Sequence, residues 1–175
     1  MRKALALVLA LTLVLALSAC GGSSEDESVS PEQTEYLEKA NDIALVIANT
    51  TSDMIQIASY EIEYTTDYRT MHNSDPSSRE LAAAAEKWYA REGGNWAALR
   101  RDYEHVIVTF EALEKTAAYK SAENSIISRC LHDMYVNYFT LFQYVANGRG
   151  NSSDAVDAAG KILDSLKAYE EAITK

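Results

Sequence analysis

The sequence has few of the residues that build compact catalytic or metal sites. It holds two cysteines and three histidines among 175 residues, with no CxxC and no His-x-x-x-His pair. A glycine-rich phosphate loop and a hydrolase nucleophile elbow are also lacking. A di-iron site in a helical bundle requires Glu-x-x-His on two helices, whereas the chain offers only Asp102-x-x-His105 and Arg129-x-x-His132. We therefore expect no metal, no cofactor and no enzymatic activity.

Basic residues are scarce as well. Sixteen lysines and arginines stand against 26 aspartates and glutamates, which gives a formal net charge of −10. A chain this acidic repels the phosphates of nucleic acid and the head groups of anionic lipids. We therefore expect no nucleic-acid partner and no broad electrostatic face for a membrane.

Long apolar runs are limited to one segment near the N-terminus. Residues 4–17 are Ala, Leu, Val and one Thr, and they follow Arg2 and Lys3. A helix of these 14 residues reaches about 21 Å, short of the hydrocarbon core of about 30 Å. The run is typical of the apolar core of a secretory signal peptide rather than of a permanent span.

The end of that run carries a more specific pattern. Leu17-Ser18-Ala19-Cys20 resembles the lipobox of bacterial lipoproteins. The resemblance implies a signal peptide over residues 1–19, cleaved by signal peptidase II. It also implies a diacylglyceryl (palmitate-type) anchor on Cys20, with an N-acyl chain as a further modification. The protein is then extracytoplasmic and anchored to the cell membrane, or to an outer membrane if the source has one. The alternative is an ordinary secreted protein.

Lipidation of Cys20 has consequences for the rest of the chain. Removing residues 1–19 takes away Arg2 and Lys3 and no acid, which leaves 14 basic and 26 acidic residues and a net charge of −12. Cys130 is left without an intramolecular partner, so we expect a buried thiol within an apolar core. Residues 20–30 are rich in Gly, Ser and acid and are predicted to form a disordered tether.

Residues 31–175 are predicted to form an all-α domain, an antiparallel bundle of four to five helices. In the first helix, Ser30 and Gln33 are expected to form a capping box around Pro31. Apolar residues then recur at spacings of three and four, and no Gly or Pro interrupts before Asn73, so the helix extends over about 40 residues. The polar cluster at residues 49–52 is a place where it could break.

Four further helices are expected after this one. The second starts at Asp75-Pro76 or at the Ser77–Glu80 pair and ends at Gly93-Gly94. The third is capped by Asn95, the fourth runs from Ser121 to Asn147-Gly148, and the fifth is capped by Ser152 or Ser153. The side chains predicted to face inward on the fifth are Val156, Ala159, Ile162, Leu163, Leu166, Tyr169 and Ile173.

Two groups of residues are candidates for partner binding. Tyr60, Tyr64 and Tyr68 lie one helical turn apart and share a face of the first helix. They are either boundary residues, with the ring in the core and the hydroxyl in water, or a strip on which a ligand stacks.

The second group surrounds the Gly93-Gly94 elbow, where aromatic residues alternate with arginines in an otherwise acidic chain. Either the tryptophans close one end of the core and the arginines pair with acids, or the elbow is a recognition surface. The residues of this second group are Trp88, Tyr89, Arg91, Trp96, Arg100 and Arg101.

The favoured hypothesis is a membrane-anchored, non-enzymatic helical lipoprotein that binds an envelope protein, a polymer or a small ligand. The alternative is a structural or assembly accessory, or an exclusion factor, of an envelope complex. A metal-binding protein or an enzyme is the third and least favoured hypothesis.

Overall fold

A computed structural model describes residues 30–148 and 152–174. The described residues form six helices and no strand, so the predicted all-α class is confirmed. The signal peptide, Cys20 and the tether up to residue 29 lie outside the described residues, and none of the described helices has the length and apolarity needed to cross a bilayer. The helices are α2 (Pro31–His72), α3 (Ser78–Arg91), α4 (Trp96–Leu113), α5 (Ala117–Lys120), α6 (Ser125–Asn147) and α7 (Ser152–Ile173).

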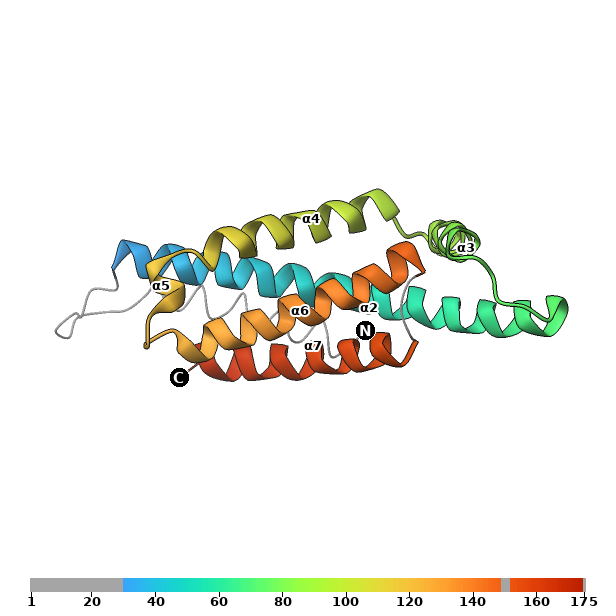
Figure 1. Ribbon diagram of the computed structural model, residues 1–175. Coiled ribbons are helices and arrows are strands. Elements are labelled where there is room, and N and C mark those ends of the chain that lie inside the picture. The colour runs from blue at the N-terminus through green and yellow to red at the C-terminus, as the bar shows by residue number, and fades with distance from the viewer. Residues whose placement is uncertain (1–29, 149–151, 175) are drawn as a thin grey trace.

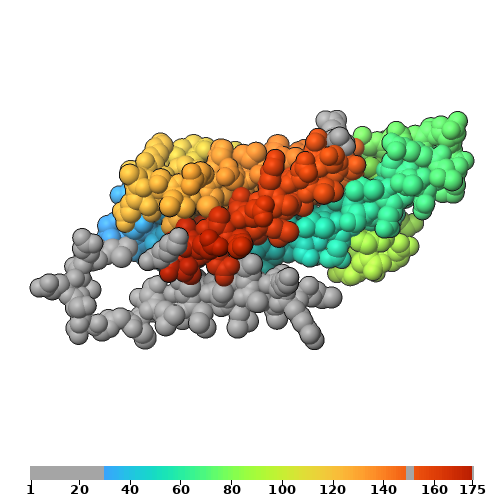
Figure 2. Space-filling view, turned by 90° about the horizontal axis from the view of Figure 1, so that it is seen from below, coloured from blue at the N-terminus to red at the C-terminus, as the bar shows by residue number. Residues whose placement is uncertain are grey.

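Four long helices form the body of the molecule. α2, α4, α6 and α7 lie side by side, and α4 and α7 run opposite in direction to α2 and α6 (Figure 1). α3 lies across the C-terminal part of α2, which projects with α3 beyond the ends of α6 and α7 (Figures 1 and 2). The fold therefore has a four-helix body and an overhanging end built from α2 and α3.

The number of helices differs from the prediction. The expected fourth helix starts at Ser125 rather than at Ser121, and a short additional helix, α5, precedes it, because Ser121 and Asn124 hold a turn between the two. The Asn124 amide donates to the Ala118 carbonyl oxygen at 2.9 Å, and the Ser121 backbone N–H bonds to the same carbonyl at 3.2 Å. Side chains that bond to nearby backbone compete with helix continuation, which accounts for the additional short helix.

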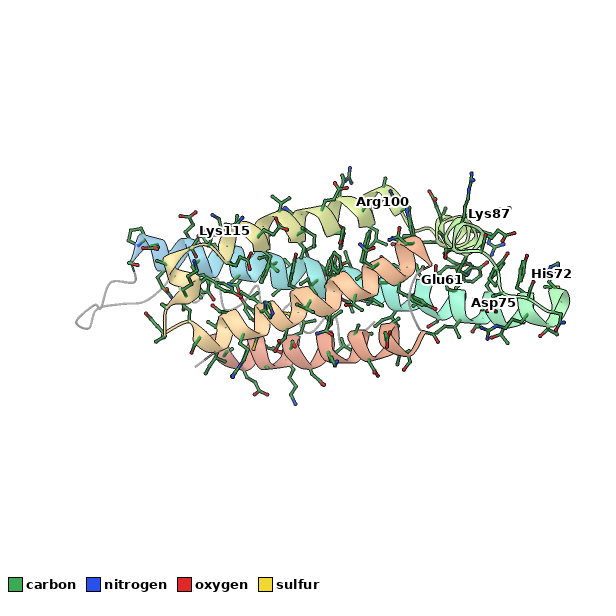
Figure 3. All side chains as sticks on the ribbon, viewed as in Figure 1. Glu61, His72, Asp75, Lys87, Arg100 and Lys115 are labelled. Carbon is green, nitrogen blue, oxygen red and sulfur yellow. The ribbon has the colours of Figure 1, made fainter. Side chains whose placement is uncertain are left out.

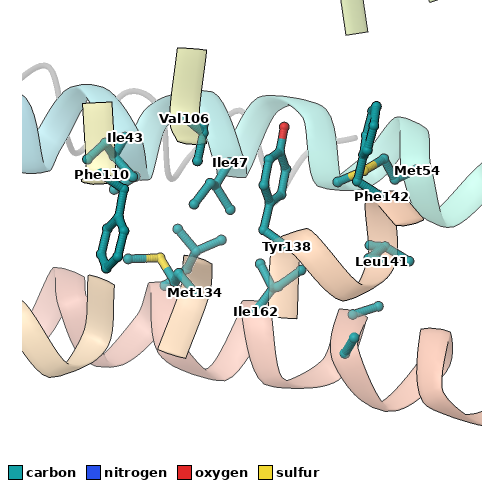
Figure 4. Packing of buried hydrophobic residues seen from close by; sticks show 14 of the residues in the cluster. Ile43, Ile47, Met54, Val106, Phe110, Met134, Tyr138, Leu141, Phe142 and Ile162 are labelled. Atoms are coloured by element: carbon teal, nitrogen blue, oxygen red, sulfur yellow. The ribbon is translucent and has the colours of Figure 1, made fainter. Parts of the chain in front are cut away.

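The core is built around α2, which packs against each of the other five described helices. Its buried stripe meets Val106 and Phe110 of α4, Met134 and Tyr138 of α6, and Ile162 of α7 (Figure 4). Burial of such side chains supplies the main stabilising free energy in a domain without a disulfide.

α2 is continuous through its polar cluster. The Thr50 hydroxyl donates to the Val46 carbonyl oxygen at 2.8 Å and lies 2.8 Å from the Tyr138 hydroxyl. The Thr51 hydroxyl donates to the Ile47 carbonyl oxygen at 2.6 Å. Both hydroxyls are thus satisfied inside the helix, and the possible break at residues 49–52 does not occur.

The N-terminal caps of α2, α3 and α4 agree with the predictions except at one point. The Ser30 side chain accepts the Gln33 backbone N–H, but the Gln33 amide is paired with Asn124 instead of returning to Ser30, so the predicted capping box is wrong. Of the two predicted starts of α3, the Ser77–Glu80 capping box is the one that forms. Asn95 caps α4 as expected.

Two predictions for α7 were wrong. Val156 and Leu163 were expected to face inward, but they are 61% and 54% exposed. The buried stripe passes instead through Ala155, Ala158, Ile162, Leu166 and Tyr169. α7 packs mainly against α6 and secondarily against α2, which leaves the side that carries Val156 and Leu163 in solvent.

Candidate binding surface at the C-terminal end of α2

A continuous row of aromatic rings lies on the overhanging end. The Trp88 indole stacks on the Tyr60 ring with centroids 4.8 Å apart and planes 8° apart. The ring centroids of Tyr60 and Tyr64 are 5.9 Å apart, and those of Tyr64 and Tyr68 are 6.0 Å apart. The Tyr68 and His72 ring centroids are 4.3 Å apart. We call these five residues the aromatic strip.

The strip forms because of two local features. The tyrosines repeat every four residues, so one helix face carries all three. The alanine-rich part of α3 lets that helix approach α2 closely, with Ala85 fully buried, and this brings Trp88 over Tyr60. Trp88 of the elbow group therefore joins the three tyrosines in one surface, which their separation in the sequence did not reveal.

The strip is half-buried. The three tyrosines and Trp88 keep part of their rings in solvent, and the neighbouring Met71 is 72% exposed. Within the described residues, the three tyrosine hydroxyls form no hydrogen bond to protein. Burial raises the pKa of the Tyr60 hydroxyl above its usual value, while nearby Arg91 acts in the opposite direction. The rings are thus fixed by packing while their hydroxyls remain available.

Tyr89 and Trp96 have a different role from Trp88. Tyr89 is 9% exposed, and its hydroxyl donates to Asp53 Oδ2 at 2.6 Å. Trp96 is also 9% exposed and meets the Tyr89 ring edge-on, with centroids 6.1 Å apart. A Cβ on Gly94 would overlap the Tyr89 ring, so the elbow requires glycine there. These two rings close the end of the core and lie beneath the surface.

The arginines at the elbow are exposed and do not pair with acids. Arg91, Arg100 and Arg101 form no ion pair with any described residue, whereas Arg69 pairs with Asp75. Arg91 lies beside the strip, since its charge acts on Tyr60. Arg100 is on α4, near α3 (Figure 3).

Glu61 is a candidate that was not predicted from the sequence. Its side chain is fully buried, and neither carboxylate oxygen has a hydrogen-bond partner among the described residues. Burial raises the pKa of Glu61 to about 9. The signal was present in the sequence, because Glu61 follows Ile57 and Ala58 at spacings of four and three and therefore continues the apolar stripe of α2.

Other possible sites are small or structural. The described residues contain no group of three or more His, Cys, Asp or Glu side chains able to hold a metal. His105 is paired with Asp42 at 2.5 Å, and Cys130 is buried as predicted. An apolar cavity of about 100 Å³ lies between α2, α6 and α7, lined by Ile55, Ala58, Ser59, Ile62, Leu141, Ala155, Val156 and Ala159.

Comparison of the chain with protein-family models, curated proteins and solved structures finds no match. Function is therefore argued from the residues of this chain alone.

Proposed function

We propose that this chain is a lipid-anchored extracytoplasmic protein, held to the membrane through Cys20, that binds an envelope protein through the aromatic strip. The observation that carries this proposal is the strip itself, a row of half-exposed rings assembled from two helices. Tyr, Trp and Arg are the residues most enriched where protein interfaces gain their binding energy. The strip supplies the first two, and Arg91 supplies the third.

The direction of α2 supports the same function. The helix begins at Pro31, next to the segment that leads back to Cys20, and the strip begins at Tyr60. Thirty residues of helix separate Ser30 from Tyr60, and at 1.5 Å per residue this distance is about 45 Å. With Cys20 in the membrane, α2 carries the strip away from the anchor by that length. A surface so placed is suited to reach a partner beyond the lipid.

The proposal has two parts that one set of variants tests separately. Cys20→Ala removes the acylation site and leaves the strip unchanged. The double variant Tyr64→Ala/Tyr68→Ala removes two exposed rings and leaves Cys20 and the Tyr60–Trp88 stack in place. Phe139→Ala is the matched control, because Phe139 is 43% exposed on α6 and does not belong to the strip.

The measurements are fatty-acid labelling in the native cell and affinity capture from detergent extracts, followed by mass spectrometry. Labelled acyl chains should appear in all variants except Cys20→Ala. Wild type, Cys20→Ala and Phe139→Ala should capture the same envelope protein, and the double tyrosine variant should capture at least tenfold less. An unlabelled wild type would refute the anchor. Equal capture by the double tyrosine variant would refute the strip as the binding surface.

A further inference from the structure

Glu61 occupies an unusual place for an acid. It lies on α2, below α3 and near the C-terminal end of α6 (Figure 3). Its side chain has no exposed area, and both carboxylate oxygens lack partners among the described residues. A buried carboxylate without a partner is strongly disfavoured, so the closed arrangement requires the protonated, uncharged acid.

The surrounding helices bring no cation to this acid. From α6 the titratable neighbour is Tyr144, whose pKa is raised mainly by its own burial and further by Glu61. The C-terminal half of α6, residues 134–147, has no charged residue. From α3 the buried side chains are Leu81, Ala85 and Tyr89, and the Tyr89 hydroxyl is held by Asp53. The charged side chains of α3 and of the nearby start of α7, all exposed, are Arg79, Glu80, Glu86, Lys87, Arg91, Asp154 and Asp157.

α3 is the element that can uncover Glu61 with the least disruption. Only three of its 14 residues are buried, and it lies outside the four-helix body (Figure 1). A turn at residues 73–77 precedes it, and the Gly93-Gly94 elbow follows it. Elements with few buried apolar contacts open at low free energy while the rest of a domain stays folded.

We propose that α3 is a flap that closes over uncharged Glu61 and is released when this carboxyl becomes charged. Trp88 leaves Tyr60 when the flap is released, so the complete aromatic strip exists only over the neutral acid. As regulation of the binding surface, this inference rests on the proposed function. The movement of α3 itself does not depend on any partner.

The pH dependence of the release of α3, in direction and in steepness, follows from proton linkage. An exposed glutamate loses its proton near pH 4.5, whereas burial raises the pKa of Glu61 to about 9. Between these two values the closed state holds a proton that the open state has lost. Each rise of one pH unit in that range shifts the open-to-closed ratio about tenfold toward the open state.

The two tryptophans of the chain allow a direct test, since Trp88 is on α3 and Trp96 follows the elbow. Fluorescence of the purified full chain in detergent is recorded from pH 5 to pH 9, without any partner. Wild type should show a red shift as pH rises, while circular dichroism at 222 nm keeps at least nine-tenths of its amplitude. Glu61→Gln and the apolar Glu61→Met should show no shift, and exposed Glu63→Gln should behave as wild type.

Three results would overturn the flap. The first is a wild-type spectrum that is constant over the range. The second is a shift of equal size and midpoint in both Glu61 variants. The third is a loss of helical signal in step with the fluorescence, because this means that the whole bundle unfolds. Partner capture at pH 6 is measured separately, so failure of the flap and failure of the binding surface give different results.

Discussion

The Trp88 indole lies almost parallel to the Tyr60 ring, with 4.8 Å between centroids, although the two residues belong to different helices. This contact joins α3 to the overhanging end of α2 and completes the aromatic strip. Aromatic pairs contribute about 0.5–1.5 kcal/mol beyond the burial of their surface. The contact is therefore both a structural link and a part of the proposed binding surface.

Trp88→Ala should lower the free energy of unfolding by about 2 kcal/mol, because it removes the stack and part of the buried indole surface. Trp88→Phe keeps a ring on Tyr60, so it should lower the free energy of unfolding by less than half as much as Trp88→Ala does. Lys87→Ala, at the exposed neighbouring position, should stay within about 0.5 kcal/mol of wild type. Urea unfolding followed by circular dichroism measures all three. Equal costs for Ala and Phe at position 88 would show that the ring stack contributes nothing.

The stability of the protein should fall as pH rises above the ordinary pKa of a glutamate. The pKa of Glu61 is raised to about 9 in the folded chain and is near 4.5 in the unfolded chain. Between these values the folded state holds one proton more, so the free energy of unfolding decreases by about 1.4 kcal/mol per pH unit. The decrease ends near pH 9, or earlier where α3 is released.

Glu61→Met should remove this contribution. Urea midpoints are measured for both proteins at each pH from 5 to 9. The midpoint of the variant should rise relative to that of wild type with each increase in pH. Parallel profiles for the two proteins would show that Glu61 does not titrate across this range.

Local patterns in the sequence predicted much of this fold. The seam of α2 and the caps at Ser77 and Asn95 follow from side chains that interact within a few residues, and such interactions can be read from spacing. The tyrosine row is also local. Two differences from the prediction arise between distant segments: Gln33 pairs with Asn124, and α7 turns Val156 and Leu163 outward. Neither is determined by nearby sequence, because each depends on how helices dock.

For the candidate site too, the sequence predicted the local arrangement but not the contacts between helices. Spacing placed Tyr60, Tyr64 and Tyr68 on one face, but the crossing of α3 over α2 decides that Trp88 joins them while Trp96 is buried. The burial of Glu61 does not follow from its spacing alone, because an acid in an apolar stripe is usually exposed at the edge of that stripe. Its complete burial depends on how neighbouring helices pack over α2, which the sequence pattern does not specify.

Removing one partner of the hydrogen bond between Thr50 and Tyr138 should destabilise the protein more than removing the other. The Thr50 hydroxyl also bonds to the Val46 carbonyl oxygen, whereas the Tyr138 hydroxyl, inside a fully buried side chain, has Thr50 as its partner. Thr50→Val leaves that hydroxyl unsatisfied and should cost about 1–3 kcal/mol. Tyr138→Phe leaves Thr50 bonded within its helix and should cost about 1 kcal/mol or less. Thermal unfolding of the two single variants and of the double variant measures the difference. The double variant should be no less stable than Thr50→Val, and full additivity of the two costs would contradict the pairing.

Replacing glycine by alanine should change the stability of the protein in opposite directions at Gly94 and at Gly160. A Cβ at Gly94 overlaps the buried Tyr89 ring, whereas a Cβ at Gly160 on α7 meets no atom within 4 Å. Gly94→Ala must displace Tyr89 from Asp53 and should destabilise the protein by about 1–3 kcal/mol. Gly160→Ala replaces glycine inside a helix and should stabilise it by about 0.5–1 kcal/mol. Urea unfolding measures both changes, and Trp96 fluorescence in a Trp88→Phe background reports the elbow. Because Tyr89 is one of the three buried side chains of α3, only Gly94→Ala should alter that fluorescence in the folded state. An unchanged elbow in Gly94→Ala would show that the close approach to Tyr89 does not fix the position of α3.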